Sequence, residues 1–257
     1  MRSIWSGSIA FGLVNIPIKL FSATESAHLD LDMLDKRDHA NVKYQRVNAD
    51  TGKEVPWSDV VKGYKQDGDY VVLTDDDFEK ASPKKSKMIE IEEFAEEPMI
   101  DPAFYDTPYY MEPAKGGERA YALLREALKD TGKVAVGRFV MRSRENLCIL
   151  RAQDEMLMLM KLRFAEEIRD TKELDLPSAK IEIKPAELKM AEALIDQLTP
   201  KKFDISKYKD TYDKELLKLI EAKSKGKKIA APKVKATKTK TVDLMEQLKA
   251  SLHKKAS

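Results

Sequence analysis

The feature that most constrains the fold is a series of three short β-rich segments at hairpin spacing. They cover residues 134–141, 147–152 and 156–162, and polar residues at 142–146 and 153–155 separate them. Connections this short join strands that are antiparallel neighbours in one sheet. Regular short strands with polar turns therefore predict a closed or nearly closed antiparallel barrel.

Two earlier segments add strands to this barrel. Residues 5–24 (WSGSIAFGLVNIPIKLFSAT) alternate in their second half, and Gly7 and Gly12 interrupt the run. This pattern indicates either two strands with a tight connection or one strand with a bulge. Residues 87–94 (KMIEIEEF) alternate as a half-exposed strand.

The chain between these segments has weaker patterns. Residues 42–47 and 70–73 are β-rich runs, and residues 48–52 between them are typical of turns. Thr74 and the acids 75–77 indicate the start of a helix, with Thr74 as its cap. The three acids could alternatively bind a divalent metal, but acids at a helix start usually complement the helix dipole.

Helical periodicity appears in residues 118–129, which Gly132 ends, and again beyond the barrel in residues 186–198 and 208–223. The last two helices follow the barrel and do not alternate with its strands. Their apolar stripes must be buried against their own barrel or against a partner. The residues expected at a dimer contact are Leu216, Leu219 and Ile220.

Charge is unevenly distributed along the chain. Residues 223–257 hold eleven lysines and two acids, whereas the other residues hold 35 basic and 42 acidic side chains. The tail can attract a polyanion, while the body as a whole would repel one. Residues 224–241 hold almost no large apolar side chain and are expected to be disordered. A lysine-rich terminus can also be no more than a solvated tail.

A short helical pattern returns at residues 243–252, with an apolar stripe formed by Leu244, Leu248 and Leu252. An apolar stripe behind a flexible linker is typical of a docking peptide. The alternative is a frayed terminus.

Catalytic signatures are sparse. The three histidines lie far apart in the sequence and away from Cys148, and there is no Walker loop. Residues 115–117 could cradle a phosphate before a helix, although Glu118 favours a plain turn. Cys148 lies in an apolar strand and is expected to be a buried hydrophobic residue; a single cysteine allows no intrachain disulfide. Without an apolar stretch of bilayer length or a signal sequence, we expect a cytoplasmic protein that does not bind membranes.

Several motifs resemble those of bacterial Ku proteins. The opening residues 5–17 (WSGSIAFGLVNIP) match the start of that family, and the similarity extends to about residue 223. The other matching motifs are residues 61–64 (VKGY), 70–75 (YVVLTD), 100–102 (IDP), 108–110 (PYY), 120–128 (AYALLREAL), 162–164 (LRF), 167–169 (EIR) and 208–210 (YKD).

This resemblance implies a mixed β/α fold, mainly β, with a seven-stranded barrel, arm insertions and appended C-terminal helices. It also implies a ring-shaped homodimer that binds ends of double-stranded DNA without sequence preference in non-homologous end joining. Such a protein is associated with the nucleoid and is not an enzyme. It is expected to recruit a ligase, with DNA ligase D as the favoured partner. The expected parts are a barrel over 1–163 with a DNA-encircling arm at about 80–115, a helical arm over 164–223, and a basic tail with a short helix over 224–257.

Many relatives carry a Cys-x-x-Cys pair where this chain has residues 48–51 (NADT). Without thiolates there, we predict no structural zinc, no other metal and no cofactor.

Sequence-independent binding of DNA needs contacts to phosphates, so the candidates are lysines and arginines. Two of these candidates lie on the early strand at 42–47, and three lie in the expected arm at about 80–115. Two more are expected on one face of the strand that begins at residue 134. The others are lysines of the basic tail. The rival functions are a nuclease acting on the same ends and a barrel module that does not bind DNA. The expected DNA-binding residues are Lys43, Arg46, Lys84, Lys85, Lys87, Arg138, Arg142, Lys225, Lys227, Lys228, Lys233, Lys235, Lys238 and Lys240.

Overall fold

The computed structural model describes residues 1–81, 87–178, 181–226 and 244–253. The chain divides into two compact units, Met1–Asp170 and Thr171–Ser257, which are described separately. No helix within the described residues is both long and apolar enough to span a lipid bilayer.

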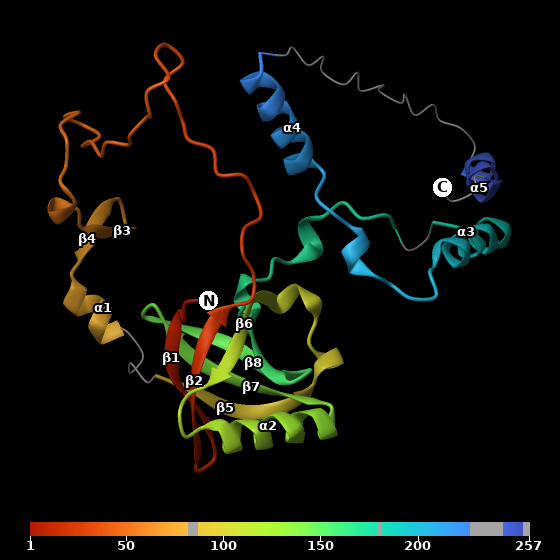
Figure 1. Ribbon diagram of the computed structural model, residues 1–257, viewed down its shortest axis with the longest axis horizontal. Coiled ribbons are helices and arrows are strands. Elements are labelled where there is room, and N and C mark those ends of the chain that lie inside the picture. The colour runs from red at the N-terminus through yellow and green to blue at the C-terminus, as the bar shows by residue number, and fades with distance from the viewer. Residues whose placement is uncertain (82–86, 179–180, 227–243, 254–257) are drawn as a thin grey trace. The chain divides into compact units, whose positions relative to one another are not determined.

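The first unit contains a closed barrel of seven strands in the order β1-β2-β6-β9-β8-β7-β5 (Figure 1), which confirms the expected fold class. The N-terminal segment forms two strands with a tight connection at Gly12 and Leu13. The strands are β1 (Trp5–Phe11), β2 (Val14–Ser22), β5 (Met88–Glu96), β6 (Tyr105–Pro113), β7 (Lys133–Met141), β8 (Arg144–Gln153) and β9 (Met156–Leu162).

The barrel is not wholly antiparallel, and in this respect the sequence prediction was wrong. β1 and β5 pair in parallel, with Ser8 opposite Met88 and Ile9 opposite Ile89. A short turn can join only antiparallel strands, whereas a long connection lets the chain return in the same direction. Residues 23–87 carry the chain from β2 past β1 to β5, so β5 runs opposite to β2 and parallel to β1.

The expected arm at about 80–115 was misplaced. Two barrel strands, β5 and β6, lie within this range, and short 3-10 helices at Glu97–Met99 and Pro102–Phe104 join them. Pro98 and Pro102 lie in these short helices, whereas Pro108 and Pro113 lie in β6. The long excursion from the barrel is instead residues 23–87.

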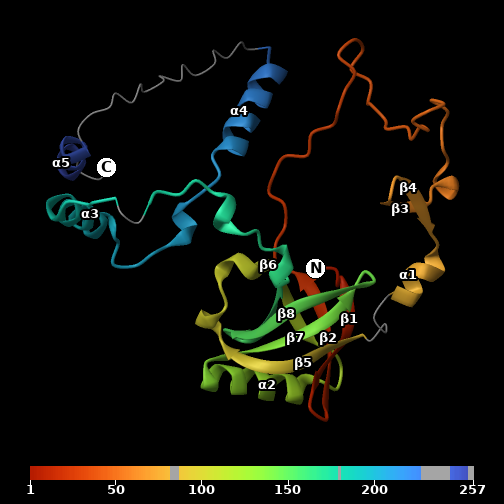
Figure 2. The ribbon, with the colours of Figure 1, turned by 180° about the vertical axis from the view of Figure 1, so that it is seen from behind.

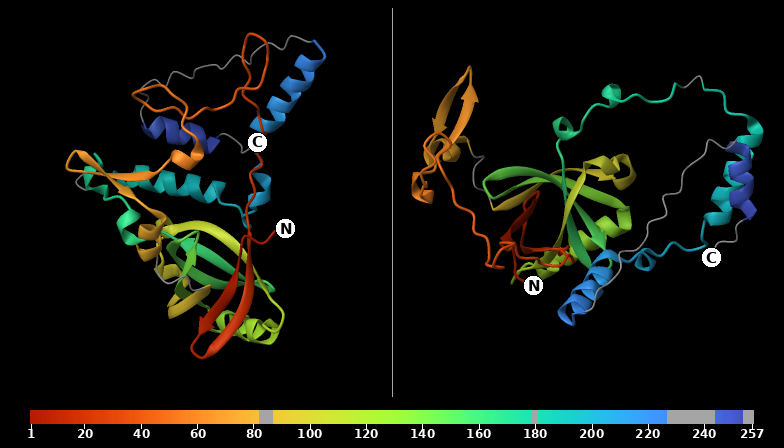
Figure 3. Two further views of the ribbon diagram at one scale, coloured as in Figure 1. Left: turned by 90° about the vertical axis from the view of Figure 1, so that its left-hand side faces the viewer. Right: turned by 90° about the horizontal axis from the view of Figure 1, so that it is seen from above.

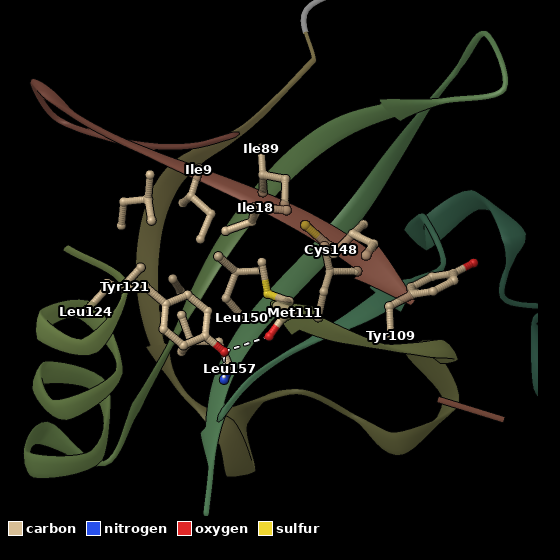
Figure 4. Close-up of a cluster of buried hydrophobic side chains, with 14 of the residues drawn as sticks. Ile9, Ile18, Ile89, Tyr109, Met111, Tyr121, Leu124, Cys148, Leu150 and Leu157 are labelled. Atoms are coloured by element: carbon tan, nitrogen blue, oxygen red, sulfur yellow. Dashed lines mark hydrogen bonds between the residues drawn. The ribbon is translucent and has the colours of Figure 1, made fainter. Parts of the chain in front are cut away.

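The barrel interior is filled by side chains that alternate along the strands, among them Ile9, Ile18, Ile89 and Phe139. Cys148 is fully buried, as expected, and its Sγ lies 3.4 Å from the carbonyl oxygen of Gly137. Burial raises the pKa of this thiol well above its usual value, so Cys148 is a poor nucleophile. Figure 4 shows the cluster around it.

Helix α2 (Glu118–Thr131) packs on the barrel through Tyr121, Leu124 and Leu128 and ends at Gly132 in the left-handed conformation. Figure 2 shows α2 lying along the barrel wall beside β5. The hydroxyl of Tyr121 donates a hydrogen bond to the carbonyl of Met111 (2.7 Å) and accepts one from the N–H of Leu157 (2.6 Å). Tyr121 therefore joins the helix to β6 and β9 (Figure 4).

Replacing Tyr121 with Phe should lower the free energy of unfolding by about 1–3 kcal/mol, since a buried N–H and a buried carbonyl lose their partner. Urea denaturation of the variant and of Tyr64→Phe, whose side chain is exposed, would measure this. Equal stability of the two variants would contradict a structural role for the Tyr121 hydroxyl.

The insertion between β2 and β5 holds a hairpin, β3 (Lys62–Gln66) and β4 (Asp69–Leu73), followed by α1 (Asp75–Ala81). Thr74 caps α1 as expected: its hydroxyl accepts from the N–H of Asp77, and the Asp77 carboxylate accepts from the Thr74 N–H and hydroxyl. The β-rich run at 42–47 is not a strand, because only an isolated bridge between Val47 and Glu54 forms there.

The second unit contains α3 (Pro185–Leu198), α4 (Tyr212–Ser224) and α5 (Leu244–His253), which confirms the three predicted helical segments. α4 begins four residues later than the pattern predicted. At the start of α4 the Asp210 carboxylate accepts a hydrogen bond from the Tyr212 N–H. Residues 205–207, before it, form a separate 3-10 turn. Figure 3 shows α3 and α5 side by side, and these two helices pack against each other.

Candidate nucleic-acid interface

Two exposed cations of the barrel, Arg142 and Arg144, lie at the tip of the β7–β8 hairpin. Arg142 and Ser143 have positive φ angles of 53° and 63°. Two such residues form a two-residue hairpin turn whose twist matches that of the flanking strands. Arg142 is therefore in the turn and not on the strand, and the expectation that it shares a strand face with Arg138 was wrong. Arg142 and Arg144 are exposed and form no ion pair with another described residue.

Arg138 has a different environment on β7. Its Nε lies 3.1 Å from Glu92 and its Nη1 lies 3.3 Å from Glu145. Two carboxylates thus offset its charge on the barrel wall. The two carboxylates lower the positive potential that Arg138 presents to a DNA phosphate, so it is a weaker candidate than the sequence suggested.

Other cations on the barrel wall are also paired with acids. The clearest case is Asp106, which lies 3.0 Å from Lys161 Nζ and 3.5 Å from Arg163 Nη2. The hydrogen bond from Lys161 lowers the pKa of Asp106, so the carboxylate stays charged at neutral pH. Further pairs join Lys19 to Glu112, Arg151 to Glu97, and Arg125 to Glu155.

The insertion presents cations against aromatic rings. The Arg46 guanidinium lies 4.9 Å from the centre of the Trp57 ring, and Lys62 Nζ lies 4.7 Å from that of Phe78. Such contacts hold a cation in place while its charge stays available. Lys43 and Arg46 are exposed but lie in irregular chain, not on the strand expected there.

Lys87 is exposed at the point where the insertion returns to the barrel. Its carbonyl oxygen accepts a hydrogen bond from the N–H of Ser8 (2.8 Å), which fixes its backbone to β1. Lys84 and Lys85, shortly before it, lie outside the described residues.

In the second unit, Lys225 is exposed at the end of α4. On α4, Leu216 is half-buried, and Leu219 and Ile220 are 38% and 41% exposed. Leu248 and Leu252 of α5 are half-buried, and Leu244 begins that helix. The remaining tail candidates, Lys227, Lys228, Lys233, Lys235, Lys238 and Lys240, lie outside the described residues.

Sequence reasoning did not single out Arg144, Lys62 or Lys65 as DNA-binding residues. Arg144 follows the hairpin turn directly, and the two lysines are exposed on β3. A signal was present, because the two lysines flank Gly63 and Tyr64 in a short polar strand. Cations at turns and on exposed hairpins can contact phosphates but are poorly placed to enter a groove as a helix does.

Comparison with known proteins completes this description. The family model described as "Ku70/Ku80 beta-barrel domain" matches residues 10–190. The non-homologous end joining protein Ku of Coxiella burnetii is 40% identical over 99% of this chain and 95% of its own length. The protein of the same name from Opitutus terrae is 40% identical over 98% of this chain and 92% of its own length. That of Bacillus subtilis is 38% identical over 98% of this chain and 82% of its own length. The family model matches most of the chain, and relatives of about this identity match nearly all of it, including the seven-stranded barrel and its insertion. The chain belongs to the Ku family.

Proposed function

We propose that this protein binds ends of double-stranded DNA, without sequence preference, as a ring-shaped homodimer in non-homologous end joining. The observation that carries the proposal is the insertion at 23–87, which leaves the barrel and exposes cations beside aromatic rings. Two such insertions related by a two-fold axis can close around a duplex, which one barrel cannot do. A closed ring admits DNA only where the duplex has an end.

Dimerisation follows from apolar surface that the described residues leave uncovered. Trp57, Tyr64 and Tyr70 of the insertion are 72%, 66% and 69% exposed. Large aromatic side chains gathered on one segment are typical of an interface, since their burial in a dimer is favourable. A second copy of the chain is the partner that supplies the matching surface.

The similar proteins are named for end joining, a process that finishes with ligation. We propose that this chain protects and bridges the ends, catalyses no step itself, and brings a ligase, DNA ligase D, to them through α5. The buried, poorly ionised Cys148 supplies no nucleophile. The rival nuclease and the barrel module that does not bind DNA remain outcomes of the test below.

Linear duplex should bind at least tenfold more tightly than a covalently closed circle of the same sequence, and the affinity should fall steeply with salt. A gel-shift competition between the two forms measures the selectivity. The variant Arg142→Gln/Arg144→Gln should weaken binding equally for all sequences, lowering the salt slope by about one unit for each phosphate that is no longer neutralised. Arg138→Gln is the matched control and should change the slope little.

Equal affinity for circles and linear DNA would contradict the ring. Shortening of the DNA during incubation would favour the nuclease, and no shift with either form would favour the barrel module.

A further inference from the structure

The terminal helix α5, which the sequence marked as a docking peptide, already contacts another helix of its own unit. α5 packs against α3 (Figure 3). On α3 the half-buried residues are Glu187, Met190, Ala191 and Leu194, which follow the spacing of a single helix face. On α5 they include Met245, Leu248 and Leu252, again on one face.

The length of α5 makes this contact necessary for its structure. α5 has ten residues, and an isolated helix shorter than about 12–15 residues is marginal in water. Packing of an apolar face is what usually stabilises such a helix in a protein. The helical form of α5 thus depends on α3.

The contact between α3 and α5 is also small enough for a partner of α5 to replace it. Its apolar side chains are only half-buried on both helices, and the remaining faces of α3 and α5 are exposed. Residues 227–243 tether α5 to the end of α4, and a tether raises the effective concentration of α5 near α3. A weak contact held by a tether yields to a partner that binds the same face more tightly.

We propose that α3 is the docking surface for the α5 helix of the same chain, and that this contact is a latch that competes with the partner of α5. The inference rests on the proposed ligase recruitment through Leu248 and Leu252. While α5 is on α3, its leucine face is covered. The partner takes α5 only by displacing it from α3.

Cross-linking tests the contact directly. In the variant Met190→Cys/Met245→Cys, which keeps Leu248 and Leu252, a short, reducible bis-maleimide should link α3 to α5 within one chain, read by peptide mass spectrometry at low protein concentration. Lys189→Cys/Met245→Cys is the matched control, because Lys189 is exposed on the other side of α3. The native Cys148 is buried and its raised pKa keeps its reaction slow. Equal linking in both variants, or linking in neither, would overturn the contact.

The linked protein then tests the latch. It should bind linear DNA as the unlinked protein does, but bind purified DNA ligase D at least tenfold more weakly, and reduction of the linker should restore binding. Undiminished ligase binding in the linked state would overturn the latch while leaving end binding intact. Loss of end selectivity in the unlinked, full-length protein would instead refute the proposed function.

A deletion supplies a measurement that does not depend on the cysteine variants. Ending the chain at Gly226 should speed amide hydrogen exchange in α3 but leave α2 unchanged. Unchanged exchange in α3 would show that α5 does not cover it, and the proposal would fail.

Discussion

Ending the chain at Gly226 should remove most of the salt-sensitive affinity for DNA and leave the selection of ends intact. The deletion takes away nine lysines and two acids. Each phosphate contact contributes about 0.9 to the slope of log affinity against log salt, and six contacts correspond to roughly a thousandfold loss between 50 and 200 mM salt. The remaining chain has more acids than cations, so little non-specific attraction is left. Fluorescence anisotropy across a salt series measures both the slope and the affinity.

A charge variant separates the lysines from the terminal helix. Changing Lys233, Lys235, Lys238 and Lys240 to Gln keeps α5 and should lower the slope by up to about four units. If the truncated protein and the charge variant both keep the full slope, the tail is only solvated and takes no part in binding.

The variant Leu216→Asp/Ile220→Asp should convert the proposed dimer to a monomer. Both residues lie on one face of α4, and burying a carboxylate in an apolar contact costs several kcal/mol unless it is paired. The loss of two apolar side chains adds about 1.5–3 kcal/mol each. A change of this size weakens association at least a thousandfold. Sedimentation velocity at micromolar concentration measures it, and the monomer should also lose its preference for linear DNA.

Lys214→Asp is the matched control, because Lys214 is exposed on the opposite face of α4. It should remain a dimer. A stable dimer for the double variant, with a circular dichroism spectrum like that of the parent, would show that α4 takes no part in the interface and would leave the insertion alone to form it. A loss of the spectrum would mean that α4 is needed for folding.

The sequence by itself determined the local elements. Apolar period-two segments fixed β7, β8 and β9 within a few residues, because strands with one buried face require that spacing. The helix at α2 followed from its apolar stripe and from Gly132, and the cap of α1 followed from Thr74. The basic tail is visible directly in the composition. The number of barrel strands came from family resemblance and not from periodicity.

Only the tertiary structure decided how these elements meet. The parallel closure of β1 on β5 and the position of the long insertion depend on contacts between residues far apart in the chain, which periodicity does not encode. The same is true of the candidate site: Glu92 and Glu145 offset the charge of Arg138, and the turn rotates Arg142 off the strand. It is also true of the α5 stripe, which the sequence predicted to dock on another protein and the structure packs on α3. A local pattern states which face of an element is apolar or charged, but the partner of that face is set by the packing of the whole chain.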